Sequence, residues 1–185
     1  MSDTPSYDPP KPPAPSGGLP PALANLSDRT LLWIQVGGGA VAFIGSLLSW
    51  VTLSTPGGIG VGFSQSYNAF HFGFWGILAF ILAILVTALA AIKVFNVTIQ
   101  GFDKLPSWLP LVLTGVLALI AVIEWLGILT GFASVTENGV SASISTIRDF
   151  GTSASTGAGI WLVLLASLAA FGATLLPVLK ARGTS

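Results

Sequence analysis

The sequence has 185 residues, of which 52% are hydrophobic and only 8% charged, and its mean hydropathy is +0.84. An ordinary soluble domain is about a quarter charged, so these side chains cannot cover a globular surface in water. Seven basic and seven acidic residues give no net charge, which argues against a protein that binds nucleic acid through its phosphates. With no cysteine and one histidine, the chain lacks thiol chemistry and the usual ligands of a metal centre. The composition predicts an integral membrane protein that is not an enzyme and needs no cofactor or metal.

Residues 1–26 differ in kind from the rest of the chain. Eight of the twelve prolines lie in this stretch, among Ser, Asp, Gly and Lys, and no apolar run interrupts them. Such a segment cannot bury enough surface to offset the entropy of ordering it. We expect a disordered Pro-rich tail, followed by a membrane domain over residues 27–185.

Four apolar segments follow, at about residues 30–53, 74–92, 108–129 and 160–179. At a rise of about 1.5 Å per residue, a helix of this length spans the hydrocarbon core of a bilayer, which is about 30 Å thick. Only a helix satisfies its own backbone hydrogen bonds within one such segment. The fold class predicted is therefore an all-α bundle of four transmembrane helices.

The basic residues predict how the bundle is oriented, because cytoplasmic loops carry an excess of Lys and Arg. Six of the seven fall on the side of the two termini, and the outer loops at 54–73 and 130–159 hold one, Arg148. The six are Lys11, Arg29, Lys93, Lys104, Lys180 and Arg182. We expect a multi-pass protein of the plasma membrane with both termini in the cytoplasm.

The two outer loops carry strand signals. Residues 51–63 alternate loosely around Pro56-Gly57-Gly58, which suggests two short strands and a turn. In the second loop, Asn138-Gly139 is flanked by β-branched residues, which favours a type I′ hairpin. Because an isolated hairpin is marginally stable, we expect the two loops to pair into one small extracytoplasmic sheet that caps the bundle.

Small residues recur at helical spacing, as they do where transmembrane helices pack closely. We expect these faces to hold the four helices together, with contact to another subunit as the alternative. The triplet Gly37-Gly38-Gly39 fits the same close packing. The helix-packing candidates are Gly38, Ala42, Gly45 and Ser49 in the first segment and Gly76, Ala83 and Thr87 in the second.

One acidic residue, Glu124, falls inside a predicted span, five residues before its outer end. A carboxylate there is costly and marks a candidate ion or proton site, together with His71 at the outer start of the second helix. The plainer interpretation is that Glu124 lies near the outer headgroups and bonds a hydroxyl or water within the bundle. A transport path needs several polar groups, and the inner half of the membrane offers few.

The order of the parts resembles that of small four-helix membrane proteins of actinobacteria. The resemblance rests on the Pro-rich tail, a Gly-rich first helix that ends in Ser49-Trp50-Val51-Thr52-Leu53, and the run Phe72-Gly73-Phe74-Trp75-Gly76. It implies the cell membrane of a Gram-positive-type bacterium and no activity.

The sequence thus favours a non-enzymatic accessory or scaffold subunit of a larger membrane complex. Its partners would be the lipid bilayer and other membrane subunits or further copies of itself, and not nucleic acid. The alternative is an oligomeric channel or transporter component that uses Glu124 and His71. A phage-type membrane effector fits the size and the number of spans, but no residue pattern points to it.

Overall fold

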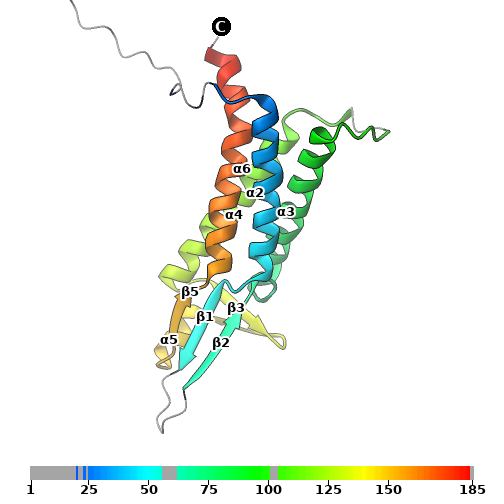
Figure 1. Cartoon of the computed structure of the whole chain (residues 1–185). Helices are drawn as coiled ribbons and strands as arrows, with labels where there is room; N and C mark the ends of the chain where they lie inside the picture. The colour runs from blue at the N-terminus through cyan, green and yellow to red at the C-terminus, as the bar shows by residue number, and fades with distance from the viewer. Residues whose placement is uncertain (1–19, 21–22, 24, 56–61, 101–103, 184–185) are drawn as a thin grey trace, which may run out of the picture.

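The structure is a computed structural model and describes residues 20, 23, 25–55, 62–100 and 104–183. The predicted Pro-rich tail lies almost entirely outside the described residues. Four long helices stand side by side (Figure 1), and each is long and apolar enough to cross a membrane. The four predicted apolar helices are therefore present. They are α2 (Asp28–Leu47), α3 (Gly73–Val94), α4 (Leu109–Thr130) and α6 (Ala158–Gly183).

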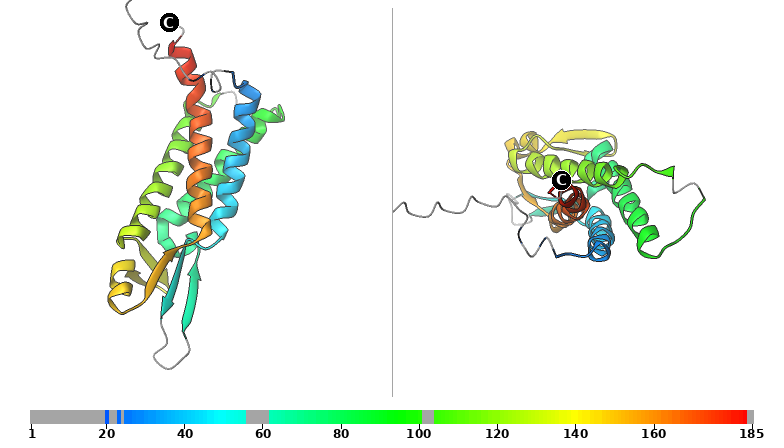
Figure 2. Two further views of the ribbon diagram at one scale, coloured as in Figure 1. Left: turned by 60° about the vertical axis from the view of Figure 1, so that its left-hand side comes forward. Right: turned by 90° about the horizontal axis from the view of Figure 1, so that it is seen from above.

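The bundle has two unlike ends. At one end α2 begins, α3 leads into α4, and α6 terminates close to the start of α2 (Figure 1). We call it the basic end, because Arg29, Lys93, Lys104, Lys180 and Arg182 lie there. At the opposite end lie the described residues between α2 and α3 and between α4 and α6, which are 48–55, 62–72 and 131–157 and which we call the cap (Figure 2).

The helices pack unevenly around the bundle. α2 packs most extensively against α6 and next against α3, while α4 packs mainly against α6. The α3–α4 pair makes the fewest contacts of the neighbouring pairs. Seen from above, α6 lies between α4 and α2 (Figure 2, right).

The first helix is shorter than hydropathy predicts. α2 ends at Leu47, Leu48 has an extended backbone with ψ 168°, and strand β1 (Val51–Thr55) begins where the sequence suggested helix up to residue 53. The Trp50 N–H donates to the Tyr67 carbonyl at 2.7 Å, so the chain is already paired as a strand there. An apolar strand that directly follows an apolar helix cannot be separated from it by hydropathy alone.

The cap contains one sheet of three antiparallel strands, in the order β2-β1-β5. β1 and β2 (Phe63–Tyr67) come from the segment after α2, whereas β5 (Ser153–Thr156) comes from the segment before α6. The two outer segments therefore do join in one sheet. The strand that joins them is β5, and not the Asn-Gly hairpin that the sequence suggested.

The Asn-Gly hairpin forms a separate two-stranded sheet. β3 (Ser134–Glu137) pairs antiparallel with β4 (Val140–Ser143). Asn138 and Gly139 have φ angles of 50° and 80°, and positive values at both positions are those of a type I′ turn. The hairpin prediction is confirmed. Two short helices, η1 (Ala69–Phe72) and α5 (Ile144–Asp149), complete the cap and were not predicted.

The three-stranded sheet has a polar and an apolar face. The residues at alternate positions on the polar face all carry hydroxyl groups, and Thr52 bonds Ser66 across β1 and β2 at 3.1 Å. They are Thr52, Ser54, Ser64, Ser66, Ser153 and Ser155. The opposite face buries Val51 and Tyr67 against the bundle. This alternation is typical of an antiparallel sheet with one solvated face, and it fixes which side of the cap faces the helices.

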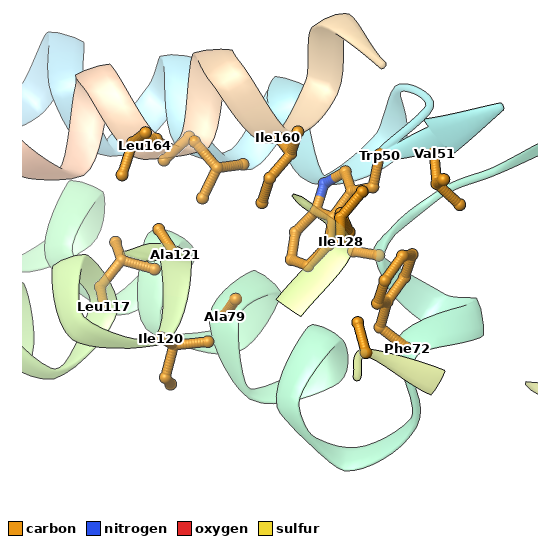
Figure 3. Packing of buried hydrophobic residues seen from close by; sticks show 14 of the residues in the cluster. Trp50, Val51, Phe72, Ala79, Leu117, Ile120, Ala121, Ile128, Ile160 and Leu164 are labelled. Atoms are coloured by element: carbon orange, nitrogen blue, oxygen red, sulfur yellow. The ribbon is translucent and has the colours of Figure 1, made fainter. Parts of the chain in front are cut away.

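The hydrophobic core runs from the bundle interior into the cap (Figure 3). Trp50 is fully buried at the junction, and its indole N–H donates to the Gly45 carbonyl at 3.1 Å. The Phe72 ring lies 5.3 Å from the Trp50 ring, with Ile128 and Ile160 close by (Figure 3). One apolar cluster therefore holds the cap against the helices.

Candidate functional site

Glu124 lies in α4 with 8% of its surface exposed, on the side of the helix that faces the bundle. No hydrogen bond or ion pair to its carboxyl is found among the described residues. The next residue, Trp125, is half-buried, and its indole N–H is buried without an acceptor in the described part of the chain. Its ring instead stacks edge-on against Trp161 of α6 at 5.3 Å.

His71 lies in η1, at the base of the cap, and is half-buried. Its Nδ1 is 3.0 Å from Asn68 Oδ1, and its ring meets the ring of Tyr67 edge-on at 5.1 Å. Between the described residues, no hydrogen bond or ion pair joins His71 to Glu124. The two candidates that the sequence placed in one site are therefore not linked to each other.

His71 belongs instead to a polar cluster on the cap. The Tyr67 hydroxyl donates to Glu137 Oε2 at 2.8 Å, and the Gln65 side-chain amide donates to Glu137 Oε1 at 3.1 Å. Together with Asn68 and His71, these side chains form what we call the cap cluster. It connects β2, from the segment after α2, with β3, from the segment after α4.

The cap cluster is built to hold two segments together. Both carboxylate oxygens of Glu137 accept a hydrogen bond, so the side chain bridges two donors on β2. Burial is the largest cause that raises the pKa of Tyr67 to about 12, and the hydrogen bond and negative charge of Glu137 add to it. Tyr67 therefore stays a neutral donor throughout the physiological pH range, and the bridge persists.

Sequence reasoning missed Tyr67 and Glu137. One signal was present: Glu137 is the acidic residue directly before the Asn-Gly turn, with no basic residue in its own hairpin. Its partners are 70 and 72 residues away along the chain. Sequence patterns such as helical or strand periodicity connect residues only a few positions apart, so they cannot predict a hydrogen bond between residues this far apart.

Arg148 of α5 also ties the cap to the bundle. Its guanidinium donates to the carbonyls of Ile128 at 3.2 Å and Leu129 at 3.3 Å, both in the last turn of α4. A third contact, of 3.5 Å, reaches the carbonyl of Ala154 in β5. The last carbonyls of a helix have no partner within it, so a cation placed there stabilises the helix end.

Two of the predicted packing glycines, Gly38 and Gly45, lie between α2 and α6. A Cβ added at Gly38 would lie 2.8 Å from the Ala166 carbonyl oxygen and 3.0 Å from the Ala170 Cβ. At Gly45 it would lie 2.9 Å from the carbonyl oxygen of Gly159. These glycines allow the two backbones to approach closely.

The packing of α2 against α3 depends on Gly39, which the sequence singled out only as part of the glycine triplet. A Cβ at Gly39 would collide with the Thr87 hydroxyl and lie 2.9 Å from the Thr87 nitrogen. Thr87 in turn donates to the carbonyl of Ala83 at 2.8 Å, and both Ala42 and Ala83 are fully buried.

The remaining two packing candidates contact the short helix η1 and the start of α6. A Cβ at Gly76 would collide with the Ala69 carbonyl of η1. Ser49 lies beyond the end of α2, where its carbonyl accepts from the Gly159 N–H at 2.8 Å.

The described residues contain no group of three or more His, Asp or Glu side chains that could hold a metal ion. Nor does the chain match any protein-family model, curated protein or solved structure.

Proposed function

We propose that this chain is a non-enzymatic integral membrane protein that acts as an accessory or scaffold subunit of a larger membrane complex. The cap is its outer docking unit, and both termini face the cytoplasm of a cell bounded by a single plasma membrane. The charge distribution supports this orientation, because five basic residues gather at the basic end and the cap holds Arg148 alone. The Arg148 side chain moreover donates its hydrogen bonds within the protein, to carbonyl oxygens of α4.

The observation that carries the proposal is the exposure of large apolar side chains on the cap, outside the four helices. Phe63, at the start of β2, is 76% exposed, Val140 beside the hairpin turn is 72% exposed, and Phe150 after α5 is 82% exposed. The bilayer covers apolar residues on the helices, but it does not reach the far end of the cap. Apolar surface that water would otherwise cover is a mark of a protein contact site.

Phe63 lies beside a hollow in the cap. The hollow, of about 440 Å³, is lined by Phe63 together with Gly62 and Gly151 and with four residues that carry hydroxyl groups: Ser54, Thr55, Ser64 and Ser153. An exposed aromatic ring beside a hydroxyl-lined hollow suits a partner protein that buries the ring and bonds the rim.

The bundle interior supports a scaffold rather than a pore within one chain. Most of the side chains that fill it are small or branched and apolar, a few such as Thr114 and Thr174 are polar, and Trp50, Ile128 and Ile160 close the end below the cap (Figure 3). The alternative, an oligomeric channel or transporter component, is favoured by one observation, the buried Glu124 carboxyl without a partner among the described residues. In that case Glu124→Gln abolishes ion or proton flux through reconstituted protein and leaves folding intact.

Photo-crosslinking tests the docking proposal directly. A photoreactive phenylalanine analogue is placed at Phe63, and a matched control carries it at Phe95, which is 64% exposed and lies at the opposite end of the bundle, just after α3. In native membranes we expect the probe at Phe63, and not the one at Phe95, to capture one larger protein in stoichiometric yield. Capture of further copies of the chain alone would favour the channel alternative, and equal capture from both positions would contradict a defined docking site.

A further inference from the structure

Two clefts open at the basic end, where α3 and α4 pack least closely. The first, of about 550 Å³, lies between the last turns of α3 and the connection that leads into α4. The second, of about 830 Å³, extends from there across α2, α4 and α6. Both are lined by Lys93, Ser107 and Pro110, so Lys93 stands where the two meet.

The first cleft has the lining of an anion site with an apolar wall. Its polar side chains are Lys93, Asn96, Thr98 and Ser107, and no Asp or Glu is among the described residues that line it. Every one of these four can donate a hydrogen bond. The remaining lining residues are apolar: Leu89, Ile92, Val97, Ile99, Leu105, Leu109 and the prolines Pro106 and Pro110.

The Lys93 ammonium has no hydrogen bond or ion pair within the described part of the chain. In the second cleft it is joined by Asp28 of α2 and Arg182 of α6, so the formal charges of the described residues that line the two clefts sum to one positive. Lys93 also occupies the last turn of α3, where the helix dipole favours a cation. The charge of the cleft is thus complementary to an anion.

Exposed aromatic residues gather at the helix ends beside the two clefts. Trp108, just before α4, is 58% exposed and lines the second cleft. Phe95, just after α3, is 64% exposed and meets Trp33 edge-on at 5.8 Å. Exposed Trp at the ends of apolar helices is typical of the membrane–water interface.

We propose that the first cleft binds one anionic phospholipid. The phosphate lies on Lys93, the side chains of Asn96, Thr98 and Ser107 bond the oxygens of the headgroup and glycerol, and an acyl chain follows the apolar wall. Basic pockets between helices on the cytoplasmic side of a membrane are a known type of site for such headgroups. This inference does not depend on what the cap binds.

A plainer interpretation is that Lys93 extends its ammonium to the interface as any lysine near a helix end does. The two interpretations differ in selectivity. If the lysine side chains only reach the interface, every lysine at the basic end contributes equally to the attraction of anionic lipid. If the first cleft is a specific lipid site, binding depends on Lys93 and on the residues that line the cleft.

The experiment counts lipids bound to the full chain in a mild non-ionic detergent by native mass spectrometry, with phosphatidylglycerol or phosphatidylcholine added. We expect one phosphatidylglycerol per chain to be retained in preference to phosphatidylcholine. Lys93→Gln weakens this binding about five-fold, the contribution of one lysine at an anionic surface, and Lys93→Arg retains it. Lys104→Gln is the matched control, because Lys104 is exposed at the same end and lines neither cleft.

Ser107→Glu provides a second variant that does not remove the lysine. A carboxylate in the cleft repels the lipid phosphate, whereas an acidic residue before the first turn of α4 is favourable to that helix. We expect it to lower phosphatidylglycerol binding as Lys93→Gln does, with unchanged helix content by circular dichroism.

Three results would overturn the proposal. They are equal retention of the two lipids, equal loss from Lys93→Gln and Lys104→Gln, and displacement of the bound lipid by inorganic phosphate at the lipid's own concentration. The last result would mean that the cleft recognises free phosphate and not a lipid.

Discussion

Thr114 of α4 and Thr174 of α6 share a hydrogen bond of 2.9 Å between their hydroxyl groups in the interior of the bundle. Among the described residues buried in the bundle, no other side-chain hydrogen bond joins two of the four long helices to each other. Such a bond within a membrane contributes about 0.6 kcal/mol on average. The bundle is therefore held mainly by close packing of its small residues.

The glycine triplet of α2 offers a matched test of this packing. We expect Gly39→Ala to destabilise the bundle by about 1–3 kcal/mol, because the new Cβ meets the backbone of Thr87 in α3. Gly37→Ala is the control: no atom lies within 4 Å of a Cβ there, and loss of a glycine inside a helix stabilises it by about 0.5–1 kcal/mol. Thermal unfolding in detergent measures both, and shifts of the same sign and size would contradict the packing argument.

The Tyr67–Glu137 hydrogen bond stabilises the attachment of the hairpin to the sheet. We expect Tyr67→Phe to reduce the stability of the cap by about 1 kcal/mol, the net contribution of one hydrogen bond, because Glu137 is exposed and can be solvated by water instead. Limited proteolysis of the cap reports this loss. Tyr7→Phe, the same change at the chain's second tyrosine, in the N-terminal tail, should leave the cleavage rate unaltered.

The raised pKa of Tyr67 makes the cap sensitive to alkali. Because the folded state holds the proton up to a pH of about 12, against about 10 for an ordinary tyrosine, this stabilisation is complete below pH 10 and is lost as the pH rises toward 12. Tyrosinate absorbance of the Tyr7→Phe protein should titrate near pH 12. Glu137→Gln should lower that midpoint without restoring it to 10, since burial is the largest cause of the shift; a midpoint that does not move would contradict the role of Glu137.

The turn of the β3–β4 hairpin requires positive φ at both of its central residues. Asn138→Pro fixes φ near −65°, far from the observed 50°, so we expect the hairpin to open and the cap to be cleaved faster from outside. Asn138→Gly adopts positive φ freely and should leave cleavage unchanged. The helix content of both variants should equal that of the parent, since the four long helices do not depend on this turn.

The proposed orientation can be tested without removing any native residue, because the chain has no cysteine. We expect Ser141→Cys, exposed on the hairpin, to react with a membrane-impermeant maleimide on intact cells. Lys104→Cys, exposed at the basic end, should react after the membrane is opened and not before. The reverse pattern would place the cap in the cytoplasm.

The long helices were predictable because one physical quantity, hydropathy summed over about 20 residues, determines them. The hairpin at Asn138-Gly139 was predictable because its turn geometry is a local property of two residues. The boundary at Leu47 was not, since Trp50 and Val51 are as apolar as the helix before them. The pairing of β1 with β5 could not be predicted either, because the paired residues lie about a hundred positions apart in the sequence. Thr52 and Ser155 are one such pair.

The candidate site residues show the same difference between what local sequence predicts and what depends on distant parts of the chain. The sequence singled out Glu124 and His71 because each residue type is unusual in its setting, and the structure buries the first and half-buries the second. His71 contacts Tyr67 and Asn68, which lie four and three residues before it in the chain. The hydrogen bond from Tyr67 to Glu137 spans 70 residues and depends on how the cap folds, so no local pattern predicts it.

The pairing of β1 with β5 has a mechanical consequence. β1 starts four residues after the end of α2, a single glycine separates β5 from α6, and Val51 lies opposite Thr156 at the junction. The two helices thus continue into a single pair of strands, closed by the hydrogen bonds from Gly157 to Trp50 and from Gly159 to Ser49. A rotation or piston motion of α2 against α6 would have to shear this register, so we expect the two helices and the three-stranded sheet to move as one rigid unit. A displacement of the sheet would then tilt α2 and α6 together.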